Sequence, residues 1–158
     1  MLFRSQRGRD EVEMNQFITD LRARSGVRTI DRGSLSSARE MIQVIRRGGM
    51  LAFVLDQNIR TESVKVRFFG VPALTPIGPA RFAVRSEAHV SIALTERRAD
   101  GIQILTFSEP IQCKPDDDPI ALTARVTAAI EAQIRRTPEQ WVWFHDRWRE
   151  RPKWEVRS

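Results

Sequence analysis

The sequence predicts an α/β fold in which a mixed sheet is flanked by helices. Three observations lead to this prediction. Apolar residues recur at helical spacing in several segments of the chain. The short, continuously apolar run Met50–Leu55 is typical of a strand that is buried on both faces of a sheet. Val64, Val66 and Phe68 alternate with basic residues, which indicates a strand with one face in water.

The chain begins with a basic, polar segment without periodicity, so we expect residues 1–9 to be an exposed arm and residues 10–158 to form one domain. A helix is predicted over residues 10–25 and should end at Gly26, because glycine commonly follows a helix. Its apolar residues fall at i, i+3, i+4 and i+7: Met14, Phe17, Ile18 and Leu21.

A second helix should begin near residues 34–37. Ser37 and Glu40 form the S-x-x-E pattern of a capping box. Basic residues and the pair Gly48-Gly49 mark its end. The apolar run Met50–Leu55 follows directly, which places a helix before the buried strand.

The middle of the chain reads as a loop, a helix and a hairpin. A loop rich in glycine and proline follows the alternating strand. Gly78-Pro79 then begins a helix that continues to about Ala88, since proline is tolerated at the first helical position. Residues 90–94 and 102–107 should pair antiparallel across the turn pair Asp100-Gly101.

The C-terminal third consists of a long helix and an aromatic segment. After the acidic residues 116–118, a helix is predicted over Pro119–Arg136. Pro138 begins the last segment, in which aromatic residues crowd beside arginines. These aromatic residues fit two interpretations, packing onto the sheet or contact with a membrane interface, where tryptophan and arginine are favoured.

The basic residues are almost all arginines. Of 26, only Lys65, Lys114 and Lys153 are lysines, and the net charge is +6. Guanidinium groups bind phosphate and carboxylate bidentately, which suits phosphorylated ligands, anionic lipids, acidic proteins or nucleic acid. A genome rich in G and C would explain the same arginine content without any partner.

Three classes of feature are not predicted. Cys113 is the only cysteine, so no internal disulfide and no structural zinc site are expected. We expect no bound metal and no cofactor. The longest clean apolar run, Met50–Leu55, is far shorter than the roughly 20 residues of a membrane-spanning helix, and the N-terminus does not resemble a signal peptide.

Several short stretches follow one another in a specific order. They are Gly48-Gly49, Asp56-Gln57, Arg67-Phe68-Phe69-Gly70, Thr75-Pro76-Ile77-Gly78-Pro79-Ala80, and Pro138-Glu139-Gln140-Trp141-Val142-Trp143-Phe144-His145 with Arg147 and Arg151-Pro152. Their order and spacing resemble the late lipid A acyltransferases, a branch of the lysophospholipid acyltransferase superfamily. The resemblance covers nearly the whole chain from about Asn15. Ser91 departs from it, because the family usually has a proline near this strand.

The resemblance implies a fold similar to that of the glycerolipid acyltransferases. Residues 10–158 would then be the C-terminal part of one domain whose N-terminal portion, including a helical membrane anchor, is not in this sequence. It also implies transfer of a fatty acyl chain from acyl carrier protein or coenzyme A to a hydroxyl of a lipid A precursor or related glycerolipid. That activity belongs to lipopolysaccharide synthesis at the cytoplasmic face of the bacterial inner membrane, which this chain would contact peripherally.

The family's catalytic motif is His-x4-Asp/Glu, in which the histidine is the general base. A hydroxyl is a poor nucleophile until a positioned base takes its proton. His89 has Leu94 five residues on and does not fit. His145 and Glu150 have the right spacing, but they lie inside the closing aromatic signature, so we interpret His145 as structural, packing among tryptophans or bonding a backbone carbonyl. No catalytic residue is assigned, and the chain alone is expected to be inactive.

The predicted substrate-binding residues start with Asp56 and Gln57. They follow the buried strand, and α/β sheets bind ligands beyond the carboxyl ends of their strands; a loop cap would explain Asp56 equally simply. Phe69 and Gly70 are predicted to form a wall, which the resemblance places along an acyl groove.

Arg81 and Arg85 lie about one helical turn apart and are candidates to grip a phosphate. A solvated helix face explains both arginines as well.

Two other function classes stay open on the sequence. One is a catalytically silent fragment or pseudoenzyme, suggested by the motif's absence. The other is a basic nucleic-acid-binding module, which rests on arginine content alone and predicts steeply salt-dependent binding. We expect no nucleic-acid partner.

Overall fold

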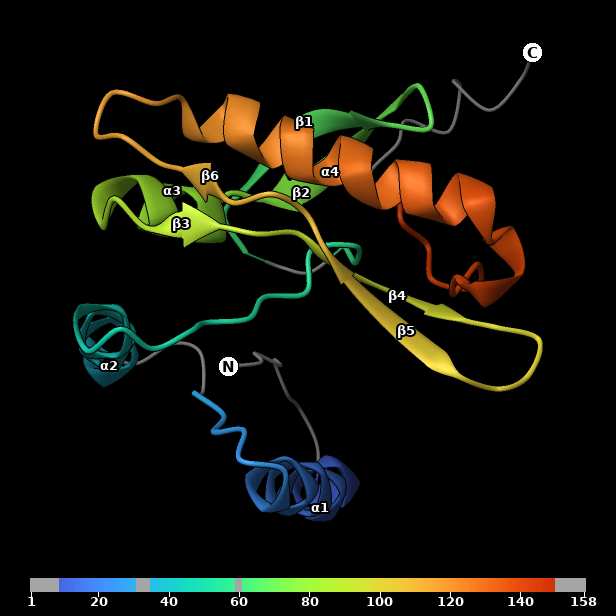
Figure 1. The fold of residues 1–158 in the computed structure, drawn as a ribbon, viewed down its shortest axis with the longest axis horizontal. Helices are drawn as coiled ribbons and strands as arrows, with labels where there is room; N and C mark the ends of the chain where they lie inside the picture. Colours follow the sequence, from blue (N-terminus) through green and yellow to red (C-terminus); the bar gives the residue numbers. More distant parts are fainter. Residues whose placement is uncertain (1–8, 31–34, 59–60, 150–158) are drawn as a thin grey trace. The chain divides into compact units, whose positions relative to one another are not determined.

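A computed structural model describes residues 9–30, 35–58 and 61–149 of the chain (Figure 1). The chain divides into two compact units, residues 1–54 and residues 55–158. The first unit contains helices α1, Arg9–Arg24, and α2, Leu35–Arg46. Both helices were predicted, and Gly26 follows α1 with a φ of 73°, as expected of a helix stop. The predicted arm, residues 1–9, lies almost entirely outside the described residues.

Helix α2 begins within the predicted range, but the predicted capping residue lies inside the helix. The helix begins at Leu35, so Ser37 lies in its first turn and is buried there instead of capping it. Gly48-Gly49 follow α2 as predicted, and the backbone N–H groups of both glycines bond to carbonyls of the last turn. The sequence pattern therefore located the helix, whose first residue lies within the predicted range 34–37, but Ser37 is inside the helix and not at its cap.

The predicted buried strand Met50–Leu55 is absent from the structure. These residues form no strand, and the side chains of Met50 and Val54 are 76% and 45% exposed. A strand satisfies its backbone only through a neighbouring strand. No strand among the described residues pairs with this run, so its apolar composition alone does not make it part of a sheet.

Within residues 55–58 and 61–149, the second unit holds six strands in three two-stranded antiparallel sheets. The fold is therefore of the mixed α/β class, built in the described residues from small antiparallel sheets. The first sheet pairs β1, Ser63–Phe68, with β2, Val71–Pro76. Val66 and Phe68 of β1 are buried while Lys65 and Arg67, which alternate with them, are exposed, as the alternation predicted. Strand β2 lies where a Gly/Pro-rich loop was expected, because both strands of a two-stranded sheet are edges, where proline is tolerated.

The other two sheets are formed by the same two chain segments, residues 89–97 and 103–112, which run antiparallel. β3, His89–Val90, pairs with β6, Ile111–Gln112, and β4, Ala93–Arg97, pairs with β5, Gln103–Phe107. Between the sheets, Ile92 and Ser108 exchange two hydrogen bonds. The predicted turn at Asp100-Gly101 joins β4 and β5. The first strand of the predicted pair is interrupted after Val90 and resumes at Ala93.

Helix α4, Pro119–Arg136, has the predicted bounds and packs against several other elements of the second unit (Figure 1). Its N-cap is Asp118, whose carboxylate accepts hydrogen bonds from the N–H groups of Ile120 and Ala121. One end of α4 packs against α3, Gly78–Arg85, through a small apolar core that includes Leu122 and Cys113. The other end packs on the β1–β2 hairpin through Ile134, which contacts the cluster around Phe68.

Candidate functional site

The turn between β1 and β2 has an unusual backbone conformation. Phe69 and Gly70 form a two-residue connection, and their φ angles are 52° and 77°. A type I′ hairpin turn requires positive φ at both of these positions. Glycine adopts such a conformation freely, whereas a bulky side chain at positive φ must be held there by its neighbours.

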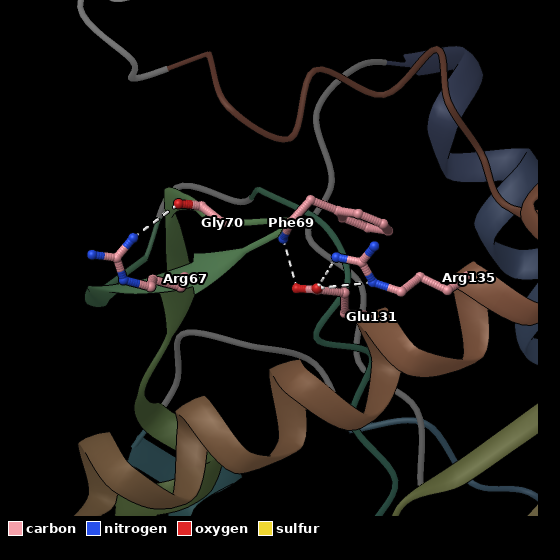
Figure 2. Close-up of polar contacts among 5 residues, drawn as sticks. All are labelled: Arg67, Phe69, Gly70, Glu131 and Arg135. Carbon is pink, nitrogen blue, oxygen red and sulfur yellow. Dashed lines mark hydrogen bonds and ion pairs between the residues drawn. The ribbon is translucent and has the colours of Figure 1, made fainter.

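Side chains from α4 and β1 hold this turn (Figure 2). The backbone N–H of Phe69 donates to Glu131 Oε2 at 2.6 Å, and Arg135 Nη2 donates to Glu131 Oε1 at 2.6 Å. The Arg135 guanidinium lies 4.8 Å from the centroid of the Phe69 ring, within cation–π range. On the opposite side, Arg67 Nη1 donates to the Gly70 carbonyl at 3.0 Å. Both turn residues are thus tied to charged side chains.

The Glu131 carboxylate is stabilised in its charged form. Partial burial raises the pKa of Glu131, but the hydrogen bonds from Arg135 and from the Phe69 amide, together with the Arg135 charge, outweigh it and bring the pKa below its usual value. The ionised carboxylate is therefore the form that binds the turn, because only it accepts both bonds with full negative charge.

Five aromatic rings pack around this turn and form what we call the Phe68 cluster: Phe68, Phe69, Trp141, Trp143 and Trp148. The Phe68 ring centroid lies 4.9 Å from that of Phe69 and 5.6 Å from those of Trp141 and Trp148. Trp143 meets Trp141 edge to face at 4.7 Å. Offset and edge-to-face pairs at these distances are the favoured aromatic geometry. The C-terminal aromatic segment is therefore fixed to the β1–β2 turn.

A buried arginine lies against the same cluster. The Arg147 side chain is 1% exposed and its guanidinium lies 5.3 Å from the Phe68 ring centroid. It donates to the Leu74 carbonyl and, at 2.6 Å, to Thr75 Oγ1 of β2. Burial lowers the pKa of Arg147 from its ordinary value, and the negative charge of Asp56 opposes part of that effect.

Asp56, which is far from Arg147 in the sequence, therefore lies near the buried guanidinium. Its Oδ2 atom accepts from the indole N–H of Trp141 at 3.4 Å. Its Oδ1 atom is buried and has no hydrogen-bond partner within the part of the chain that the structure describes. The same is true of Arg147 Nε. A buried carboxylate oxygen and a buried guanidinium N–H, each without a partner, mark a polar site inside an apolar cluster.

Asn58 and His145 join the same two segments. The backbone N–H of Asn58 donates to His145 Nε2 at 2.8 Å. A ring nitrogen that accepts a hydrogen bond carries no proton, so the His145 proton must sit on Nδ1. The prediction that His145 is structural agrees with this geometry, although its partner is a backbone N–H and not the carbonyl we expected.

The other predicted site residues lie apart from the Phe68 cluster. Gln57 is exposed beside Asp56. Arg81 is exposed on α3 and forms an ion pair with Glu62. Arg85 is exposed in the last turn of α3, and its side chain has no ion pair among the described residues. The structure thus brings Asp56 and Phe69 to one aromatic cluster but leaves the two arginines on a separate helix face.

Sequence reasoning missed several residues of this arrangement. Glu131 and Arg135 lie at i and i+4 on a predicted helix, a spacing that favours an ion pair, so this pair was detectable. Nothing in the sequence marks Arg147 as buried, because arginine is almost never fully buried unless it is paired. The partner role of Thr75 was likewise hidden, since it arises from the unexpected strand β2.

Several other chemistries find no support in the described residues. Burial, with a contribution from the charge of Asp117, raises the pKa of Cys113, so its thiol stays neutral and inert. No group of three or more potential metal ligands comes together among residues 9–30, 35–58 and 61–149. In those same ranges, no helix combines the length and apolar character needed to cross a bilayer.

Comparison with known proteins identifies two similarities. Residues 5–150 match the sequence profile of a family described as bacterial lipid A biosynthesis acyltransferase. The chain is also similar to the lipid A biosynthesis lauroyltransferase of Escherichia coli (strain K12), with 30% identity over 135 residues. That alignment covers 84% of this chain and 43% of the relative, so the chain spans less than half the length of this curated relative.

Proposed function

The chain belongs to the bacterial lipid A biosynthesis acyltransferase family, and on that basis we propose that it forms part of an acyl-transfer site. The proposed reaction moves a fatty acyl chain from acyl carrier protein or coenzyme A to a hydroxyl of a lipid A precursor or related lipid. The chain would be the C-terminal part of a domain similar to the glycerolipid acyltransferases, at the cytoplasmic face of the inner membrane. The observation that carries the proposal is the family match. Its residues, 5–150, include every residue of the Phe68 cluster.

Phe69 is the proposed wall for the acyl chain. Its ring is half-buried, its backbone is held at positive φ, and its position is fixed by Glu131 and Arg135. A rigid aromatic surface is what an apolar chain requires, since binding to a preformed wall costs little ordering entropy. Gly70 beside it exposes backbone without a side chain, which leaves room for a ligand to approach.

Asp56 is the proposed polar contact at the same site. Its Oδ1 atom lacks a partner within the described residues, whereas its Oδ2 atom accepts from the Trp141 indole N–H and the charge of Arg147 acts on the carboxylate. A ligand hydroxyl that donates to this oxygen would satisfy a buried acceptor, which is a strong basis for recognition. Gln57, exposed next to it, is the proposed second polar contact.

Arg81 and Arg85 are proposed to bind a phosphate of the acceptor. They lie at i and i+4 on α3, and Arg85 is exposed. Arg81 is already paired with the exposed Glu62, but exposed pairs are weak and exchange readily with a doubly charged phosphate.

His145 is not the base in this proposal. Acyl transfer requires the acceptor oxygen to attack the thioester carbonyl while a base takes the hydroxyl proton and the carrier thiolate leaves. His145 Nε2 already accepts the Asn58 N–H, so that lone pair is committed to the fold. The 158-residue chain by itself is therefore expected to show no acyl transfer above background.

Equilibrium binding of a fatty acyl thioester of acyl carrier protein tests the proposal. The native chain, Phe69→Ala and Phe107→Ala should be compared, because Phe107 is a 54% exposed aromatic residue on β5, away from the turn. We expect Phe69→Ala to weaken binding about tenfold, as removal of one well-buried aromatic contact would, and Phe107→Ala to leave it unchanged. Equal affinities of all three proteins would refute the assignment of the acyl wall.

A catalytically silent partner is the second candidate. The specific observation in its favour is the use of His145 Nε2 by the Asn58 backbone. A transfer assay with acyl thioester and lipid A precursor tests this candidate, which predicts no transfer under any condition. Activity that persists in His145→Ala would show that another group serves as the base, and would exclude the silent alternative.

A further inference from the structure

The C-terminal segment presents an exposed apolar surface that the acyl-transfer proposal does not use. Val142, Trp143 and Phe144 follow one another, and their side chains are 42%, 52% and 93% exposed. We call these three residues the aromatic tip. Large apolar side chains that are contiguous and exposed usually mark an interaction surface, whereas isolated ones need no explanation.

The tip is rigid at its base and open at its end. The Trp143 indole N–H donates to the Pro138 carbonyl at 2.6 Å, and the Trp143 ring packs edge to face on Trp141. Phe69 lies 6.1 Å from the same ring, measured between centroids. Phe144 follows in a turn and points away from these contacts, with 93% of its surface in water. The fold therefore fixes the Trp143 ring and leaves the Phe144 ring exposed to water.

The charges around the tip favour an anionic partner. Three exposed arginines lie near it in the sequence, Arg136, Arg149 and Arg135, the last of them paired with Glu131, against two exposed carboxylates, Glu139 and Asp146. The whole chain carries a net charge of +6. Tryptophan and arginine are both favoured at the headgroup level of a bilayer, and phenylalanine inserts into the acyl boundary below it.

We propose that the aromatic tip docks onto the interface of an anionic phospholipid bilayer, with Phe144 inserted and Trp143 at headgroup level. A protein partner would need a complementary pocket, whereas a bilayer accepts a projecting ring without one. The proposal rests on the proposed function in one respect: a lipid acceptor resides in a bilayer, so its enzyme must reach that surface. It assigns the contact to side chains for which the acyl-transfer proposal names no role, although the Trp143 ring packs on Phe69.

Vesicle binding by the full 158-residue chain tests the docking. Sedimentation with phosphatidylglycerol vesicles should be compared with phosphatidylcholine vesicles for the native chain, Phe144→Ser and Leu105→Ser. Leu105 is the matched control, because it is an apolar residue with 54% exposure on β5. We expect binding to phosphatidylglycerol to exceed that to phosphatidylcholine, and Phe144→Ser to weaken it about tenfold, as loss of one inserted aromatic ring would. Leu105→Ser should bind like the native chain.

Fluorescence quenching locates the contact independently. Brominated lipids should quench tryptophan emission in the native chain, and the quenched fraction should fall in Trp143→Phe, which keeps an aromatic ring but removes the reporter. No vesicle binding, equal loss in Leu105→Ser, or unchanged quenching in Trp143→Phe would each overturn the proposal. Because no acyl donor is present in these assays, their failure would leave the acyl-transfer proposal intact, and loss of acyl-donor binding would leave the docking intact.

Discussion

Several residues of this protein carry polar groups that are buried beside the Phe68 cluster, and the stability of the fold depends on their partners. Arg147 bonds to two groups of β2 and faces Asp56, while its Nε atom has no partner within the described residues. Burying a charge costs several kcal/mol, which is recovered only when hydrogen bonds and an opposite charge are in place. The arrangement therefore depends on every member being present.

Removal of the buried guanidinium should destabilise the fold strongly. We expect Arg147→Ala to lower the free energy of unfolding by about 3 kcal/mol, because Thr75 then loses its buried hydrogen-bond donor and Asp56 the positive charge near it. Arg125→Ala is the matched control, since Arg125 is exposed on α4. Urea unfolding measures both. A loss within about 0.5 kcal/mol, the range of ordinary surface substitutions, would contradict the structural role of Arg147.

The Glu131 carboxylate should stabilise the turn only while it is ionised. The pKa of Glu131 in the folded chain lies below the ordinary value of 4.5, so its contribution is fully present above that pH and is lost as the pH falls through the folded pKa. We expect Glu131→Gln to cost about 1 kcal/mol at pH 7, as loss of one charge-assisted hydrogen bond does. The difference from the native chain should shrink below pH 4.5.

The control for this pH series is Glu139→Gln. Glu139 is exposed in the short 3-10 helix Pro138–Gln140. Its substitution should leave the free energy of unfolding unchanged across the same pH range. A constant difference between Glu131→Gln and the native chain from pH 7 to pH 3 would show that the charge of Glu131 does not hold the turn.

At the scale of elements, short hairpins replace the larger sheet that the sequence predicted. The β1–β2 hairpin is stable because Phe68 packs under α4 and the C-terminal tryptophans. An isolated two-stranded hairpin is at best marginal in water, so each hairpin depends on what covers it. The β4–β5 hairpin has less cover, since every residue of β5 is exposed.

The hairpin turn should be sensitive to substitution at Gly70 for conformational reasons alone. A Cβ atom at Gly70 would meet no atom within 4 Å, but φ there is 77°. We expect Gly70→Ala to lower the free energy of unfolding by about 1 kcal/mol, the cost of a left-handed conformation for a side-chain-bearing residue. Gly78→Ala, where the space is also open and φ is not positive, should be within about 0.5 kcal/mol of native. Equal effects in thermal unfolding would contradict the turn geometry.

The outer edge of β5 should promote self-association. Its backbone groups on that side have no partner strand in the described residues, and Leu105 and Phe107 are each 54% exposed. Exposed apolar edges template pairing between chains. We expect Leu105→Lys to reduce light scattering by the concentrated protein, whereas Ala99→Lys in the hairpin turn, which adds the same charge, should not. Similar scattering from both variants would point to net charge as the cause.

The elements that were predicted correctly are those whose signal is local. Helix α4 was predicted with its bounds, because its apolar period and starting proline are continuous in the sequence. Strand β2 was missed because Pro72 and Pro76 read as loop residues, and only its pairing with β1 makes them strand. The prediction for Met50–Leu55 was wrong in the opposite sense. Its apolar composition indicated a strand, but composition cannot supply the neighbouring strand that a strand needs.

The candidate site was predicted only in part, for a related reason. The sequence suggested Asp56 and Phe69 separately, but their common attachment to the aromatic cluster depends on contacts across more than 60 residues of chain, such as those of Asp56 with Trp141 and of Phe69 with Glu131. The burial of Arg147 is another product of tertiary packing. Local patterns carry no record of such contacts.

At the scale of the whole molecule, two compact units each leave apolar side chains in water. In the first unit, Met14, Phe17 and Leu21 form the predicted stripe of α1 and are more than half exposed. In the second unit, β5 and the aromatic tip also expose large apolar side chains to water. Combined with a net charge of +6, the aromatic tip favours binding to an apolar and anionic partner. Low solubility of the isolated chain is the corresponding expectation.

Photo-cross-linking with an acyl carrier protein thioester that bears a photoreactive group on its fatty chain tests the central claim most directly. The account predicts labelled peptides that contain the Phe69-Gly70 turn, and loss of that label in Phe69→Ala but not in Phe107→Ala. Labelling confined to α3 or to β5, or no labelling that an excess of unmodified thioester competes away, would contradict the claim that the acyl chain lies against this turn.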